Sequence, residues 1–170
     1  SIAVRYIGDI FLDHYDQTLA NAYRHPITVD GKTSLGVLDA PDVEQFEDIV
    51  EVCIEAGKGF VLVFSLTQEG SLEAVERLRQ QIVLMKNDSS SLFTQAPIVV
   101  VGTKLDLVNE REVHQNTIQT LSNQWGVPFY ETSAKRNWHV SEAIENLVRQ
   151  LWAQYPEAEK PRTPRKKPCF

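Results

Sequence analysis

The sequence predicts an α/β domain in which helices cover both faces of a mostly parallel β-sheet. Apolar runs rich in β-branched residues alternate with amphipathic segments of helical period, which is typical of this class. The runs at 59–66 and 97–102 are apolar almost throughout, as strands buried on both faces are. At 170 residues, 42% of them hydrophobic and 24% charged, the chain suits one domain with a real core.

The predicted elements follow one another with short connections. Leu72, Val75, Leu78, Ile82 and Met85 recur at helical spacing. Asp30-Gly31 is typical of a hairpin turn between two strands. The helices are expected at 1–8 (the end of an amphipathic helix), 44–56, 71–86, 111–125 and 140–155, and the strands at 22–29, 34–38, 59–66, 97–101 and 127–131.

Composition excludes several classes of protein. No apolar run reaches the ~18 residues of a membrane-spanning helix, and no signal peptide opens the sequence. Cys53 and Cys169 lie too far apart to suggest a disulfide or metal framework, which favours a reduced, cytosolic compartment.

Charge is unevenly placed along the chain. Residues 1–159 carry 12 Lys and Arg against 23 Asp and Glu, whereas 160–170 hold five bases and no acid. An acidic body argues against nucleic acid as a partner, and a short basic tail indicates an anionic surface instead. We therefore expect a domain at 1–156 and a basic tail at 157–170, with 160–170 disordered.

Two polar tetrapeptides close two of the predicted strands. Thr103-Lys104-Leu105-Asp106 follows one, and Thr132-Ser133-Ala134-Lys135 follows the next. Ligands of open α/β sheets bind at the carboxyl ends of strands, so the two loops should converge on one site. Asp106 can accept two parallel N–H bonds from guanine, the stem of Lys104 can lie along a base, and backbone N–H groups of 133–135 can meet a carbonyl oxygen.

On these motifs the chain resembles a Ras-superfamily small GTPase, with a TKxD form of the NKxD motif and an intact SAK motif. The resemblance implies a P-loop NTPase-type three-layer fold that binds GTP or GDP with Mg²⁺. It implies that the base is bound by Thr103, Lys104, Asp106, Ser133, Ala134 and Lys135. The alternative is two ordinary strand–helix loops with a Ser/Thr helix cap.

The phosphate-binding part of the family pattern is missing. No G-x-x-x-x-G-K-[ST] motif exists, and Gly31-Lys32-Thr33, which mimics its end, falls in the predicted hairpin turn. Residues 1–7 resemble the helix that follows the P-loop, so the first, central strand is absent. Its loss would leave two neighbouring strands with unpaired backbone. We expect a fragment or a misassigned start rather than a natural domain without that strand.

Three residues resemble the family's contacts to Mg²⁺ and to the base edge. Residues 11–18 (FLDHYDQT) resemble switch I, which implies that Thr18 binds Mg²⁺ and the γ-phosphate. Asp39 matches the aspartate of D-x-x-G, which implies a Mg²⁺ contact through water. Phe11 resembles the aromatic residue beside the guanine edge. The alternatives are a loop threonine that satisfies its own backbone and simple core burial of Phe11.

Switch II departs from the family at two positions. Asp42 occupies the place of the glycine whose N–H meets the γ-phosphate, and Val43 occupies the place of the catalytic glutamine. A valine has no group to orient the attacking water. We therefore expect weak hydrolysis and name no catalytic residue. Ala20-Asn21-Ala22 replaces the acidic effector segment, so we do not expect the usual Ras effectors.

The tail resembles a Ras-type hypervariable region. A basic run with a prenylated Cys169 would supply the two signals for stable anchoring, although only Phe170 follows the cysteine. The alternative is a solvated basic tail with an incidental cysteine.

The predicted function is a GTP-hydrolysing signalling switch on the cytoplasmic face of a membrane, or otherwise in the cytoplasm. Its expected partners are effector, exchange-factor and GTPase-activating proteins and an anionic membrane surface. The alternatives are a non-enzymatic pseudoGTPase interaction module, or a fragment that does not fold alone.

Overall fold

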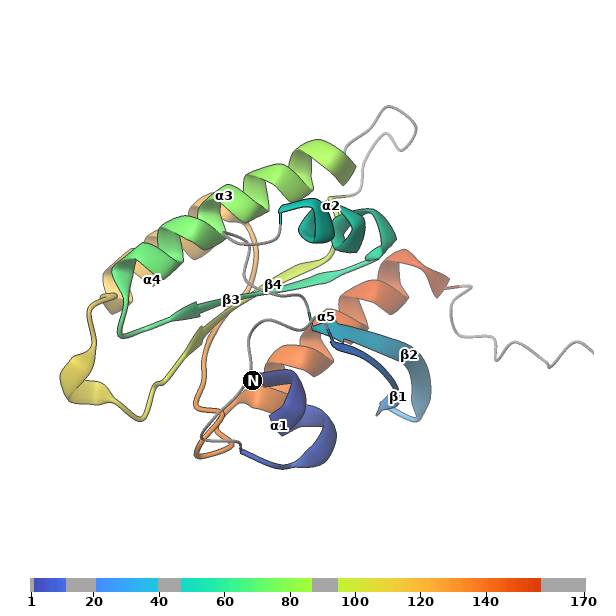
Figure 1. Ribbon diagram of the computed structural model, residues 1–170, viewed down its shortest axis with the longest axis horizontal. Coiled ribbons are helices and arrows are strands. Elements are labelled where there is room, and N and C mark those ends of the chain that lie inside the picture. Colours follow the sequence, from blue (N-terminus) through green and yellow to red (C-terminus); the bar gives the residue numbers. More distant parts are fainter. Residues whose placement is uncertain (1, 12–20, 40–46, 87–94, 157–170) are drawn as a thin grey trace, which may run out of the picture.

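A computed structural model describes residues 2–11, 21–39, 47–86 and 95–156 of the chain (Figure 1). Its elements run in the order α1 (Ile2–Gly8), β1 (Asn21–Val29), β2 (Lys32–Asp39), α2 (Glu47–Ala56), β3 (Phe60–Ser65), α3 (Glu69–Lys86), β4 (Ile98–Thr103), η1 (Val108–Glu110), α4 (Gln115–Trp125), β5 (Phe129–Glu131) and α5 (Val140–Gln154). Every strand and helix expected in the described ranges is present, so the predicted α/β fold class is confirmed. None of the described helices is both long and apolar enough to span a membrane.

The described strands form two sheets. Strands β3, β4 and β5 pair in parallel, with Leu62 opposite Val100 and Val100 opposite Phe129. Strands β1 and β2 form a separate antiparallel hairpin. Strands β2 and β3 do not pair with each other in the described part of the chain.

The turn between β1 and β2 has the predicted chemistry. Asp30 and Gly31 both have positive φ, at 49° and 77°, as a type I′ hairpin turn requires. Gly31-Lys32-Thr33 lies in this hairpin and not between a strand and a helix, so its likeness to a phosphate loop is incidental.

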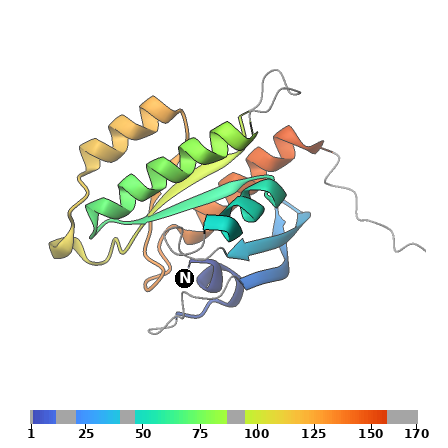
Figure 2. The same cartoon turned by 45° about the horizontal axis from the view of Figure 1, so that its top comes forward.

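Helices cover both faces of the parallel sheet (Figures 1 and 2). Alternate residues of β4 point to opposite sides, and Ile98 to Val101 are almost completely buried. Val100 packs in a core with α2, α3 and α4, whereas Val99 and Val101 pack in a second core with α1, α5 and β1. Because both faces are covered, ligands can reach β4 and β5 only at the ends of the strands.

Helix α4 starts at Gln115, four residues later than the periodicity predicts. The backbone before Gln115 makes hydrogen bonds outside the helix. Glu112 and Val113 donate their N–H groups to the carbonyl of Leu66, at 2.9 and 3.1 Å. Arg111 also turns its side chain toward β5. These contacts come from residues far away in the sequence, so helical spacing alone did not reveal them.

Close packing fixes the carboxyl end of β4. A Cβ on Gly102 would lie 2.8 Å from the Phe64 ring and 2.9 Å from the Leu66 side chain. Glycine at this position therefore lets the end of β4, and the loop that follows it, lie close against β3.

Candidate functional site

The two predicted loops meet at the carboxyl edge of the parallel sheet. Thr132 donates its N–H to the carbonyl of Gly102 at 2.7 Å, and Leu105 donates to the carbonyl of Thr132 at 2.9 Å. The Ser133 hydroxyl donates to Oδ1 of Asp106 at 2.5 Å. Residues 27 positions apart thus form one polar site, as the strand order predicted.

Lys104 adopts an unusual backbone conformation in this site. Its φ of 66° lies in the left-handed region, which costs a residue with a side chain on the order of 1–3 kcal/mol. The loop is held in this form by the Leu105 N–H bond to Thr132 and by the Leu107 N–H bond of 3.0 Å to the Lys104 carbonyl. The exposed Lys104 side chain is free of the sheet and can lie against a ligand.

Ser133 organises the second loop. It is completely buried, and its Oγ accepts the Arg136 N–H at 3.1 Å while donating to Asp106. Its backbone exchanges two bonds with Trp138, at 3.1 and 3.0 Å. Within the described ranges, no hydrogen bond uses the N–H of Ala134 or Lys135. Two backbone donors are therefore left for a ligand beside the Asp106 carboxylate.

Asp106 retains capacity to bind donors. Its side chain is half-buried, and the Ser133 hydroxyl is its one hydrogen-bond partner among the described residues. An ionised carboxylate has about four acceptor positions, so Asp106 can accept further bonds from a ligand. The two loops of the site therefore offer both carboxylate acceptors and backbone N–H donors that make no bond among the described residues.

An ion pair that the sequence did not reveal joins two segments next to the site. Arg111 makes a bidentate ion pair with Glu131, the last residue of β5, with 3.0 Å between Nη1 and Oε2. The Glu131 carboxylate raises the pKa of Arg111, and Arg111 also bonds the Val113 carbonyl at 2.7 Å. The pair joins the segment after η1 to the strand that precedes Thr132.

The sequence matches the model of the Ras family over residues 1–153, which is most of the chain. The chain belongs to the Ras family. Proteins of this family are small GTPases that act as guanine-nucleotide switches. The TKxD and SAK loops of this Ras-family chain therefore lie together, at the edge of the sheet where a nucleotide is expected.

Two other candidate residues of the Ras-family pattern lie in the described ranges. Phe11, after α1, is 37% exposed. Asp39 is half-buried at the end of β2. The remaining candidate residues lie outside the described ranges, and their roles stay predictions. They are Thr18, Ala20, Asp42, Val43 and Cys169. No group of three His, Cys, Asp or Glu among the residues placed by the structure could hold a metal ion.

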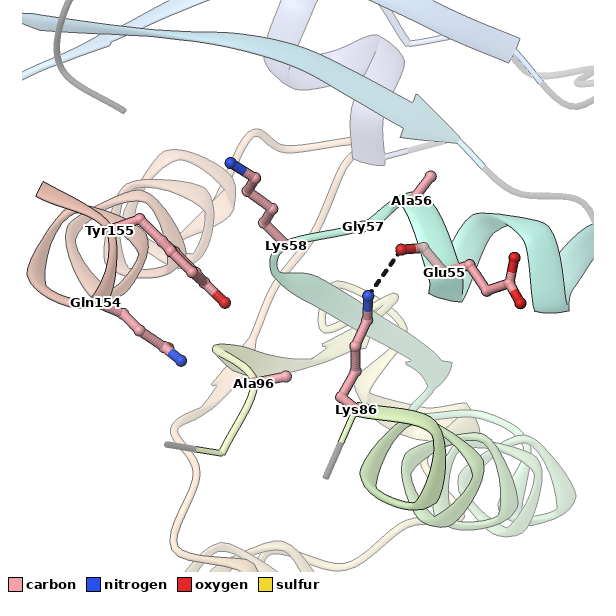
Figure 3. Close-up of a pocket in the computed structure, with 8 residues that line it drawn as sticks. All are labelled: Glu55, Ala56, Gly57, Lys58, Lys86, Ala96, Gln154 and Tyr155. Carbon is pink, nitrogen blue, oxygen red and sulfur yellow. Dashed lines mark hydrogen bonds between the residues drawn. The ribbon is translucent and has the colours of Figure 1, made fainter. Parts of the chain in front are cut away.

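A hollow of about 290 Å³ lies at the opposite edge of the sheet (Figure 3). It is lined by residues 55–58, which precede β3, by Ala96, which precedes β4, and by the ends of α3 and α5. Lys86 donates to the carbonyl of Glu55 at 2.9 Å, near the end of α2. The helix ends that meet here carry partial negative charge, which the lysine offsets. The hollow is therefore distinct from the TKxD and SAK site.

Proposed function

We propose that the chain binds guanine nucleotides through the site at the ends of β4 and β5 and acts as a signalling switch. The bond between Ser133 and Asp106, beside the N–H groups of Ala134 and Lys135, carries the proposal. It places acceptor and donors of the two family motifs on one surface.

The polarity of this surface matches guanine. The Asp106 carboxylate accepts from the ring N–H and the exocyclic amine, while a backbone N–H of the SAK loop donates to the carbonyl oxygen of the base. The alkyl stem of Lys104 covers one face of the ring. Each bond to the carboxylate contributes about 1.5–3 kcal/mol. Adenine exchanges donor and acceptor, so the same groups would be left unpaired.

Residues near α1 and β2 would complete the nucleotide site. Phe11 would pack against the edge of the base, Thr18 would bind Mg²⁺ directly, and Asp39 would bind it through water. The metal ion would neutralise charge on the phosphates. These roles rest on the family resemblance, and the half-exposed position of Phe11 is compatible with its role.

Asp42 and Val43 favour a second candidate, a family member that binds nucleotide but hydrolyses it poorly or not at all. Val43 has no polar group to orient water, and the Asp42 carboxylate would repel the γ-phosphate. Such a protein would act as an interaction module. Effector, exchange-factor and GTPase-activating proteins are the proposed partners of the first candidate, the switch.

A titration of the 170-residue chain tests the proposal. We expect guanosine monophosphate to bind more tightly than adenosine monophosphate by about 100-fold or more, because adenine would lose two bonds to Asp106. We expect Mg²⁺·GTP to bind hardly better than the monophosphate, because no phosphate-loop motif stands in the sequence. Calorimetry and nuclear magnetic resonance (NMR) titration measure both.

Two results would contradict these expectations in different ways. Equal binding of the two monophosphates would refute guanine recognition. Sub-micromolar affinity for Mg²⁺·GTP would leave guanine recognition in place and show that another loop of this chain binds the phosphates.

We further propose that the basic tail holds the protein at an anionic membrane surface. Lys160, Arg162, Arg165, Lys166 and Lys167 contribute at most about 1 kcal/mol each near anionic lipid, and salt screens this attraction within about 10 Å at 0.1 M. A lipid on Cys169 would add an apolar anchor. The proposed location is therefore the cytoplasmic face of a membrane.

Binding of the unlipidated chain to anionic vesicles should fall steeply as salt rises. Cosedimentation from low to high ionic strength measures this. A chain whose five tail bases are replaced by Gln is the control and should not sediment. If binding persists in this control or ignores salt, the electrostatic contribution is refuted.

A further inference from the structure

Arg5 joins helix α1 to the SAK loop across 129 positions of sequence. Its Nε donates to the carbonyl of Ala134 at 2.6 Å, and Nη2 donates to the carbonyl of Lys135 at 3.3 Å. The Arg5 side chain is only 12% exposed, although it is charged. A single guanidinium thus bonds two consecutive carbonyls of the loop.

These two carbonyls belong to peptide groups whose N–H ends lie in the same loop. The Ala134 carbonyl shares its peptide group with the Lys135 N–H, which has no partner in the described ranges. The Lys135 carbonyl shares its peptide group with the Arg136 N–H, which donates to Ser133 Oγ, and Ser133 in turn bonds Asp106. A charge-assisted bond at one end of a peptide group polarises and orients the donor at its other end. Arg5 therefore acts on both the donor and the acceptor side of the site.

The remaining donors of Arg5 tie the end of α1 to the same loop. Nη1 donates to the carbonyl of Asp9 at 2.8 Å and to Asp9 Oδ1 at 3.2 Å. Asn137 also donates to Asp9 Oδ1, at 3.2 Å. Asp9 and Asn137 have φ values of 51° and 57°, so both are in left-handed backbone. Only a planar fork of donors can serve these acceptors together, and a lysine would reach one of them.

We propose that Arg5 is a positioning residue of the guanine site, which holds loop 133–138 in the form that receives the base. The inference rests on the proposed function and goes beyond it, because Arg5 makes base binding depend on the position of α1. Residues 11–18, which follow α1, resemble switch I. A displacement of α1 would therefore loosen the base loop without any contact to the nucleotide.

Amide hydrogen exchange in the ligand-free, full 170-residue chain tests the structural half of the proposal. In Arg5→Gln and Arg5→Lys we expect the amides of Ser133, Arg136 and Trp138, which bond within the loop, to exchange about tenfold faster. Amides of β4 should be unchanged. Arg149→Gln is the matched control, because the Arg149 guanidinium also makes several bonds, to the carboxylates of Asp30 and Glu145, and none of them is to loop 133–138.

Titration with guanosine monophosphate tests the functional half. Both Arg5 variants should bind it about tenfold more weakly, as the loss of one bond to a charged donor implies, while Arg149→Gln should bind it normally. Unchanged loop exchange with unchanged affinity overturns the proposal. Faster exchange throughout β3 and β4 overturns it too, because Arg5 would then support the whole fold. If the unsubstituted chain binds no guanosine monophosphate, the proposed function fails. The amide exchange rates of the loop then still test whether Arg5 holds loop 133–138.

Discussion

Asp106→Asn should turn a guanine site into a xanthine site. Xanthine carries a carbonyl oxygen where guanine carries its amine, so the amide N–H₂ of asparagine donates where the carboxylate accepted. The substitution removes two charge-assisted bonds of about 1.5–3 kcal/mol each, so the affinity for guanine should fall by about 100-fold or more. Xanthosine monophosphate should gain a comparable factor, as competition titrations with the two monophosphates measure.

The control for this substitution is Asp30→Asn. Asp30 lies in the exposed hairpin turn and pairs with Arg149, and no hydrogen bond in the described part of the chain joins it to either base loop. It should leave the preference for guanine unchanged. Guanine binding that survives Asp106→Asn intact would show that Asp106 serves only to bond Ser133.

Restoring switch II should recover GTP hydrolysis in a form of the chain preceded by a phosphate loop. Unsubstituted, this form should hydrolyse bound GTP slowly, since Val43 orients no water and Asp42 repels the γ-phosphate. Asp42→Gly together with Val43→Gln should raise the single-turnover rate by about 100-fold, the usual value of one preorganised polar group in a transition state. Val43→Gln alone should recover only part of this.

The same single-turnover assay can refute the assignment of Asp42 and Val43 to these switch II positions. Fast hydrolysis by the unsubstituted sequence would show that Asp42 and Val43 do not occupy the positions assigned to them. A double variant that binds GTP but stays slow would favour the non-enzymatic candidate.

The convergence of the two base loops was predictable because it follows from strand order. Parallel strands that are neighbours in a sheet end at the same edge, so Asp106 and Ser133 had to come near each other. The hairpin turn at Asp30-Gly31 was predictable for a local reason, since both residues tolerate positive φ.

Contacts between distant side chains were not predictable in this way. Arg5 bonds carbonyls 129 and 130 positions away, and Arg111 bonds Glu131 from another loop. Neither arginine differs in local sequence from an ordinary surface residue. Local periodicity also placed the start of α4 too early, because the N–H groups of 112 and 113 bond the Leu66 carbonyl instead of the helix.

Whether the loops after β4 and β5 bind guanine can be measured by an NMR titration of the full chain with guanosine monophosphate, read at each backbone amide. We predict that shifts concentrate at 103–106 and 133–136, that the Ala134 or Lys135 amide moves most, and that adenosine monophosphate at equal concentration moves neither. Shifts centred on Lys58, Lys86 and Tyr155 at the opposite edge of the sheet, or equal shifts with both nucleotides, would contradict this prediction.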